Sequence, residues 1–252
     1  MDARWLVPEW PAPPNVRAVC TTRDGGVSQG RYQSLNLGDH VADDAAHVAE
    51  NRRRLREAVG ARPVFLQQVH GTGVVALDDE RRVVRDGTAA DGCTATATGL
   101  ACTIMVADCL PVLFTDEAGH RVAAAHAGWR GLAGGVLEQT ARSFAQDSSG
   151  KVIAWLGPCI GPKAFEVGPE VKAAFEAHAP EAAACFVPSA SAGKWLADLP
   201  ALARQRLHAA GVASVHGNDG TDAWCTVANS SRFFSHRRDG VSGRFAALVW
   251  KV

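Results

Sequence analysis

Two short motifs stand beside strongly apolar runs near the middle of the chain. Ala-Asp-Cys-Leu-Pro occupies 107–111, and His-Ala-Gly-Trp-Arg-Gly occupies 126–131. The apolar runs cover 100–114 and 121–127, and the segment 116–119 between them reads Asp-Glu-Ala-Gly. Glycine supplies the positive φ of a tight turn, and aspartate bonds nearby backbone amides. The pattern therefore predicts a β-hairpin that carries both motifs.

Counting along the two arms of this hairpin brings a cysteine and a histidine together. If Glu117 and Ala118 form the centre of the turn, Cys109 lies opposite His126. Opposed side chains hold their Cβ atoms about 4.5–5.5 Å apart, which suits a shared metal ion with Zn–S and Zn–N bonds of about 2.3 and 2.1 Å. Pro111 weakens this register, because proline lacks an N–H and occurs in sheets mainly at edges and bulges.

A third donor comes from an earlier part of the chain. His70 ends a predicted strand at 64–69 and is followed by Gly71, and glycines beside the donors allow the backbone to come close. Two nitrogens and one sulfur leave one tetrahedral position open, which is the pattern of a catalytic zinc site. We therefore expect His70, Cys109 and His126 to bind one metal ion; the alternative is that they are ordinary core residues.

Strands and helices alternate along the rest of the sequence. Apolar patterning predicts strands at 16–22, 64–69, 74–77, 151–156, 212–216 and 244–250. It predicts helices at 43–60, 131–144, 169–178 and 198–211. This alternation, together with a hairpin, indicates an α+β or mixed α/β fold rather than a purely parallel sheet. No Pro/Gly/Ser-rich linker divides the 252 residues, so we expect a single domain over 1–252.

Charge and cysteine usage narrow the class of protein. Lys+Arg and Asp+Glu both number 26, so the charge gives no reason to expect nucleic acid or an anionic membrane as a partner. Seven cysteines, several of them inside apolar runs, favour reduced thiols and a cytoplasmic location. The first residues lack the apolar core of a signal peptide, and no stretch approaches the ~18 apolar residues of a membrane span.

Three further side chains are candidates for the chemistry. Arg130 precedes a predicted helix, whose free N–H groups can bind an anion while the guanidinium binds phosphate through two nitrogens. The alternative is a glycine turn with a solvated arginine. Glu166 and Asp108 are candidate proton carriers. The alternatives are a cap or turn role for Glu166, and for Asp108 a role at a strand end or in support of a ligand.

Five motifs in this order resemble the YfiH-like laccase-domain family. They are Gln-Val-His-Gly at 68–71, the two hairpin motifs, Gly-Pro-Cys-Ile-Gly at 157–161 and Phe-Glu-Val-Gly at 165–168. Ser-Leu-Asn-Leu-Gly at 34–38 and Phe-Phe-Ser-His-Arg-Arg at 233–238 extend the resemblance over nearly the whole chain. One departure is His236, where members of the family usually carry tyrosine.

The resemblance implies a compact sandwich of mixed sheets flanked by helices, with zinc held by His70, Cys109 and His126. It also implies activity on purine nucleosides: phosphorolysis of adenosine, inosine and methylthioadenosine, and deamination of adenosine. The bacterial branch is linked in addition to editing of peptidoglycan precursors, and an older label is copper polyphenol oxidase.

From these observations we expect a zinc-dependent purine nucleoside enzyme, with a small-molecule nucleoside and phosphate as partners. The site residues are then His70, Cys109, His126, Arg130 and Glu166. In this hypothesis zinc activates a water for deamination, and Arg130 with the helix start holds phosphate for phosphorolysis.

Three alternatives use the same residues. Cys109 could be the nucleophile of an amidase that edits a peptidoglycan precursor, with His126 or His70 as base. A zinc-stabilised binding module is the non-enzymatic hypothesis, and the open coordination position argues against it. A copper oxidase is the least favoured, because a multicopper centre needs many imidazoles and the chain has nine histidines with no His-x-His pair.

Overall fold

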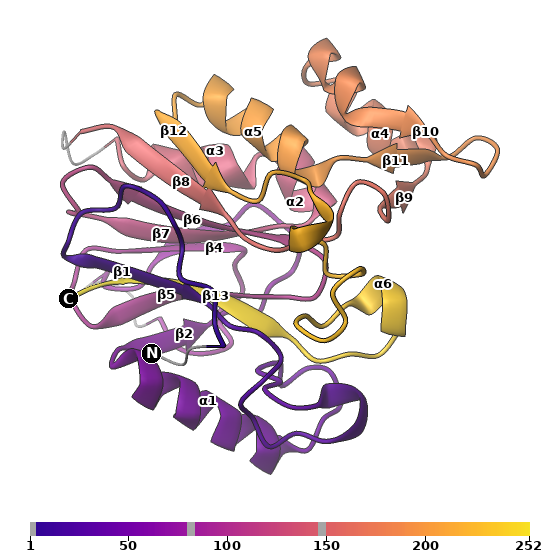
Figure 1. Ribbon diagram of the computed structural model, residues 1–252. Helices are drawn as coiled ribbons and strands as arrows, with labels where there is room; N and C mark the ends of the chain where they lie inside the picture. Colours follow the sequence, from indigo (N-terminus) through magenta and orange to yellow (C-terminus); the bar gives the residue numbers. More distant parts are fainter. Residues whose placement is uncertain (1–3, 80–83, 146–149) are drawn as a thin grey trace.

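The computed structural model describes residues 4–79, 84–145 and 150–252, and within them two large sheets lie face to face between layers of helices (Figure 1). The first sheet has four strands in the order β1-β13-β5-β2. β13 pairs antiparallel with β1 and β5, whereas β2 and β5 are parallel. Their bounds are Val16–Cys20 for β1, Phe245–Lys251 for β13, Leu100–Val106 for β5 and Arg62–Phe65 for β2.

The second sheet has six strands in the order β12-β8-β6-β7-β4-β3. Its centre is antiparallel, and its two outer pairs, β12/β8 and β3/β4, are parallel. The strands are β12 (Ser214–Gly217), β8 (Val152–Leu156), β6 (Leu110–Asp116), β7 (Val122–Ala127), β4 (Gly92–Ala95) and β3 (Val74–Ala76). A small antiparallel sheet stands apart and consists of β10 (Phe186–Pro188), β11 (Trp195–Ala197) and β9 (Glu166–Val167).

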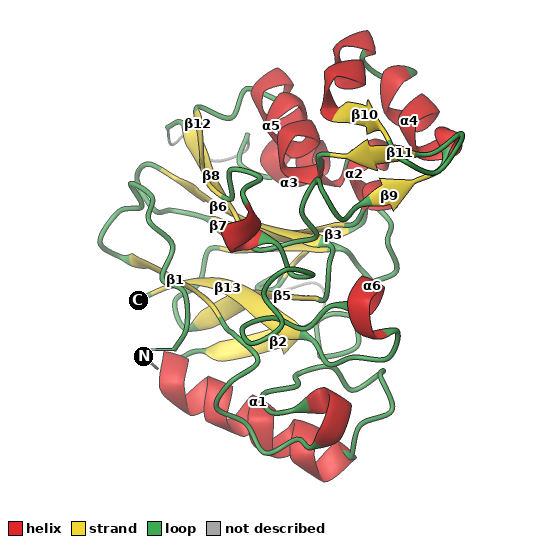
Figure 2. Cartoon of the chain, turned by 45° about the vertical axis from the view of Figure 1, so that its right-hand side comes forward, coloured by secondary structure: helices red, strands yellow, loops and turns green. Residues whose placement is uncertain are grey.

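Helices cover the outer faces of both large sheets (Figure 2). α1 (Ala45–Val59) packs on the four-stranded sheet; it begins where the Asp44 side chain accepts the N–H of Ala46 and ends at Gly60 in the left-handed conformation. α2 (Trp129–Gly134), α3 (Val136–Arg142) and α5 (Leu199–Ala209) pack on the six-stranded sheet. The remaining helices are α4 (Pro169–Glu176), α6 (His236–Asp239), η1 (Gly30–Tyr32), η2 (Pro180–Cys185) and η3 (Asp222–Trp224).

The apolar core consists of three layers because both faces of each large sheet are buried. Along β6 successive side chains alternate between faces, so Leu113 packs between the two sheets while Phe114 packs under the helices. Leu55 of α1 packs against the outer face of the four-stranded sheet, beside Leu248. Fully burying a side chain of this size stabilises the fold by about 1.5–3 kcal/mol. The sheets therefore form a rigid base for the irregular segments at their ends.

The predicted α+β class, with mixed sheets flanked by helices, is confirmed. Some details of the prediction are wrong. The apolar run 100–114 is divided between β5 in one sheet and β6 in the other, and the chain crosses between sheets at 107–109. The helix predicted at 131–144 begins at Trp129 and is split into α2 and α3 at Gly135, whose φ is 99°. β4, β9, β10 and β11 were not predicted.

The predicted register of the β6–β7 hairpin is also wrong: His126 pairs with Pro111, and Cys109 lies just before β6. The cause is the turn. The Asp116 carboxylate accepts three backbone N–H groups, at 118, 120 and 121, over 2.8–3.1 Å. These bonds extend the turn beyond the tight form that the prediction assumed and move its centre toward the C-terminus.

Candidate metal centre

The three predicted donors lie together beside the end of the six-stranded sheet. The donor atoms of His70, Cys109 and His126 are all within 4.8 Å of one another. Cys109 Sγ lies 3.8 Å from His70 Nε2, close to the separation of roughly 3.6 Å that two ligands of a tetrahedral zinc would have. The two imidazole rings are 4.8 Å apart between centroids and inclined at 71°. The three donors lie together although the predicted register was wrong, because Cys109 and His70 both come from irregular backbone that curves toward β7.

Each donor is placed by a different element. His126 is a residue of β7 and is almost fully buried. Cys109 follows Asp108 in the crossover from β5 to β6, and His70 lies beyond the end of β2, which stops at Phe65 rather than at the predicted 69. His70 and Asp108 have φ of 59° and 101°, a region that L-residues adopt at a cost of about 1–3 kcal/mol. The backbone is therefore strained where two of the donors are presented.

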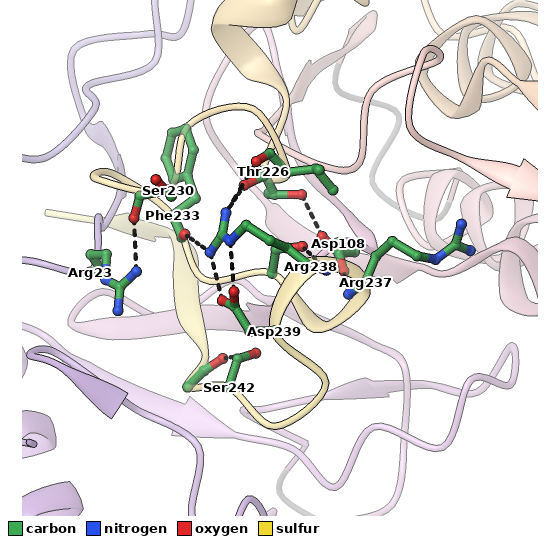
Figure 3. A network of polar contacts seen from close by, with 12 residues as sticks. Arg23, Asp108, Thr226, Ser230, Phe233, Arg237, Arg238, Asp239 and Ser242 are labelled. Atoms are coloured by element: carbon green, nitrogen blue, oxygen red, sulfur yellow. Dashed lines mark hydrogen bonds and ion pairs between the residues drawn. The ribbon is translucent and has the colours of Figure 1, made fainter. Parts of the chain in front are cut away.

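Asp108 is tied to the C-terminal part of the chain, which holds this crossover in place. Its carboxylate accepts the Thr226 hydroxyl at 2.5 Å and the backbone N–H of Arg237 at 2.6 Å, as Figure 3 shows. Both carboxylate oxygens are engaged in this way. These contacts agree with the alternative role given above for Asp108, at a strand end and in support of the neighbouring ligand.

Gly128 closes the site from the side of α2. A Cβ atom at this position would lie 2.9 Å from His70 Cδ2 and 3.0 Å from Cys109 Sγ. Real Cβ contacts are longer, so only glycine lets the start of α2 pass this close to the two donors. The site is thus bounded by the three donors and by the backbone of Gly128, which carries no side chain.

Asp91 supports two of the donors and was missed by the sequence analysis. This residue is fully buried, and its carboxylate accepts Nδ1–H of His126 at 2.9 Å and the backbone N–H groups of His70 and Gly71 at 2.9 and 2.6 Å. Tying Nδ1 in this way leaves Nε2 of His126 free for an ion and fixes the ring. The sequence offered only an Asp-Gly pair, which predicts an ordinary turn.

The electrostatics of the site favour a thiolate. Burial by itself raises the pKa of the Cys109 thiol, but the charge and hydrogen bond of His126, together with His70, lower it to about 6. Burial lowers the pKa of His126, while the Cys109 thiolate and the Asp91 carboxylate raise it to about 9. A thiolate is the form that binds metals and also the form that attacks carbon. The N,N,S set fits zinc with one open position, and the residues present could therefore hold that ion.

A cavity of about 420 Å³ opens on the donors. Trp129, Ile160 and Phe165 contribute apolar surface to its walls, while Gln68 and Arg244 are among the polar residues that line it. This volume lies in the range of ordinary small-molecule sites, which are mostly apolar with a few placed polar groups. The site is therefore large enough for an organic substrate beside the donors.

The structure does not bring Arg130 and Glu166 to the cavity; neither is among the described residues that line it. Arg130 is exposed in the first turn of α2, with its guanidinium 4.3 Å from the ring centroid of Trp129. The Glu166 carboxylate accepts the Ser189 hydroxyl and pairs with Lys194 at 3.2 Å. The Ser189 hydrogen bond, with further help from Lys194, lowers the pKa of Glu166 to about 2. The roles of Arg130 with phosphate and of Glu166 with protons stay predictions.

Comparison with known proteins adds the family. A family model described as multi-copper polyphenol oxidoreductase laccase matches residues 17–252. The chain is 55% identical to a Pseudomonas aeruginosa protein named purine nucleoside phosphorylase PA4543, over 98% of both chains. It is 48% identical to the Escherichia coli purine nucleoside phosphorylase YfiH, over 99% of this chain and all of that one.

Solved structures show the same fold. The Neisseria meningitidis protein NMB0706 superposes with a TM-score of 0.89 at 49% identity, covering 98% of this chain and 99% of that one. YlmD of Geobacillus stearothermophilus superposes with a TM-score of 0.90 at 32% identity, over 100% and 97% of the two chains. The fold and the site define an α+β protein with a His/Cys/His centre. The chain belongs to the YfiH-like laccase-domain family.

Proposed function

We propose that the protein is a zinc-dependent enzyme that acts on purine nucleosides, with phosphorolysis of adenosine, inosine and methylthioadenosine and deamination of adenosine as its reactions. The observation that carries the proposal is the 420 Å³ cavity on the His70, Cys109 and His126 donors. The names of relatives at 55% and 48% identity support the choice of substrate.

The chain's own residues bind and orient the substrate in this proposal. Trp129 and Phe165 line the cavity with aromatic surface on which a purine can stack, and Gln68 is a polar lining residue. Asp91 holds His126 in one orientation, and Gly128 leaves room for the donors. A bound zinc would supply polarisation of a substrate atom or of water.

Both reactions balance with substrates alone. In phosphorolysis a phosphate oxygen bonds to the anomeric carbon and the bond from that carbon to the purine nitrogen breaks. The nitrogen keeps the electron pair and takes the proton that phosphate gives up. In deamination a water oxygen replaces the amino group, which leaves as ammonia.

Product analysis tests the proposal directly. We expect zinc-loaded protein with inosine and phosphate to release hypoxanthine and ribose 1-phosphate in equal amounts, and hypoxanthine release to stop when phosphate is omitted. Liquid chromatography measures both products. Cys109→Ser serves as the matched inactive variant. Intact inosine after prolonged incubation with zinc-replete protein would reject the assignment.

A second candidate is an amidase that edits a peptidoglycan precursor, with Cys109 as nucleophile. A specific observation favours it: the pKa of Cys109 is lowered to about 6, against the effect of burial, by the neighbouring His126 and His70. Copper polyphenol oxidation is less favoured. Within the described ranges, His70, Cys109 and His126 are the one group of side chains that could hold an ion, whereas a multicopper centre uses many imidazoles.

A further inference from the structure

Arg244 lines the same cavity and is held there by backbone rather than by a carboxylate. Its Nη1 donates to the carbonyl oxygens of Ser242 and Gly243 at 2.8 and 3.0 Å. Its backbone N–H donates to the Asn36 side-chain oxygen at 2.8 Å. Asn36 belongs to the Ser-Leu-Asn-Leu-Gly segment at 34–38, which fits neither helix nor strand. These contacts fix both the backbone and one edge of the guanidinium.

The guanidinium of Arg244 forms no ion pair with a carboxylate in the described part of the chain. No carboxylate there lies within 4.0 Å of its guanidinium. A guanidinium has five N–H groups, and the protein contacts of Arg244 involve only Nη1, so Nε and Nη2 have no protein acceptor there. Arg244 is half-buried and lines the cavity, and its Nε and Nη2 are not buried, so this positively charged edge can bind an anionic ligand there. Burial lowers the pKa of Arg244, and the charges of Cys109 and Asp108 oppose this effect.

The rest of the cavity reinforces this charge. Asp108 is the one carboxylate among the described residues that line the cavity, and its two oxygens already accept the Thr226 hydroxyl and the N–H of Arg237. Arg237 also lines the cavity, and in Figure 3 its guanidinium points away from the Asp108 carboxylate. Within the part of the chain that the structure describes, that guanidinium donates only to carbonyl oxygens, those of Ala164 and Glu166 at 3.3 and 3.1 Å. The described lining therefore has two arginines, and its one carboxylate already accepts two hydrogen bonds.

We propose that Arg244 is the residue that binds inorganic phosphate in this cavity and directs it toward the nucleoside beside the His70, Cys109 and His126 centre. The assignment rests on the proposed phosphorolysis and replaces the earlier candidate Arg130, which lies outside the cavity lining. The free edge of the guanidinium binds two phosphate oxygens. Arg237, at the exposed part of the lining, adds positive charge that attracts the anion.

Arg244→Gln tests the assignment, because glutamine removes the charge and the fork from the position. We expect the KM for phosphate to rise at least about tenfold, since a charge-assisted bidentate contact is lost. The KM for inosine should stay within about twofold, since the nucleoside does not depend on this group. Arg244→Lys keeps the charge but loses the fork, so its KM for phosphate should lie between that of the unaltered protein and that of Arg244→Gln. Arg17→Gln, on the exposed part of β1, is the matched control and should leave both constants unchanged.

Direct binding of phosphate separates this assignment from the proposed function. Equilibrium dialysis of labelled inorganic phosphate against zinc-loaded protein needs no turnover, and circular dichroism and zinc content verify the fold of each variant. Weaker phosphate binding in Arg244→Gln supports the site even if inosine is never cleaved, in which case only the phosphorolysis fails. Unchanged phosphate binding in a folded Arg244→Gln variant overturns the assignment. A raised KM for phosphate in Arg130→Gln but not in Arg244→Gln would also overturn it.

Discussion

At the scale of single residues, the three metal donors can be predicted from the sequence, but the residue that positions them cannot. His70, Cys109 and His126 are recognisable because each is a metal-ligand residue type beside glycine or at a strand end. Asp91 gave no such signal, because its role consists of hydrogen bonds to residues 20 or more positions away in sequence. Arg244 was hidden for the same reason: only the folded chain places it in the cavity.

Asp91→Asn tests that support. The amide keeps the shape but loses the charge that binds Nδ1–H of His126, and its NH₂ replaces one of the two oxygens and so faces a backbone donor, that of His70 or that of Gly71. We expect zinc affinity to fall about 10- to 100-fold in chelator competition. Asp116→Asn is the matched control, because Asp116 is equally buried and also accepts backbone N–H groups, but in the β6–β7 turn. It should lose about 1–3 kcal/mol of stability and keep its zinc affinity. An equal loss of zinc affinity in both variants would reduce Asp91 to a structural role.

At the scale of elements, the hairpin was predicted correctly and its register was not. Turn length decides register, and the three N–H groups that bind the Asp116 carboxylate widened a turn whose sequence suggested a tight one. The split between α2 and α3 follows from Gly135 in the left-handed conformation. A glycine within a helical pattern is compatible with a continuous helix, so only the structure reveals the break.

Gly128→Ala tests how closely α2 must approach the donors. The added Cβ would meet His70 and Cys109 at about 3 Å, so one of them must move. Such overpacking costs about 1–3 kcal/mol, and we expect a comparable loss of zinc affinity, roughly 5- to 150-fold. Gly134→Ala, in the same helix, meets only the Thr72 methyl group and should bind zinc normally. Normal zinc binding by a folded Gly128→Ala protein would contradict the close approach.

At the scale of the whole molecule, the mixed sheets with outer helices could be predicted from alternating apolar patterns, but the assignment of strands to sheets could not. β5 and β6 are buried on both faces and read as one apolar run, because a strand covered on both sides has no period that distinguishes its faces. The short strands β9, β10 and β11 carry too few residues for a pattern. Within the described ranges, no helix is long and apolar enough to cross a bilayer.

The central claim is that Cys109 is a zinc ligand rather than a free nucleophile, and iodoacetamide labelling of the native protein tests it most directly. The other six cysteines are buried, so labelling reports Cys109. With about one zinc per chain bound, we predict slow labelling. Chelation should make labelling fast and abolish nucleoside turnover. Zinc added to protein that has been chelated but not alkylated should restore both slow labelling and turnover. Fast labelling of Cys109 with zinc fully retained, or turnover unaffected by chelation, would contradict the account.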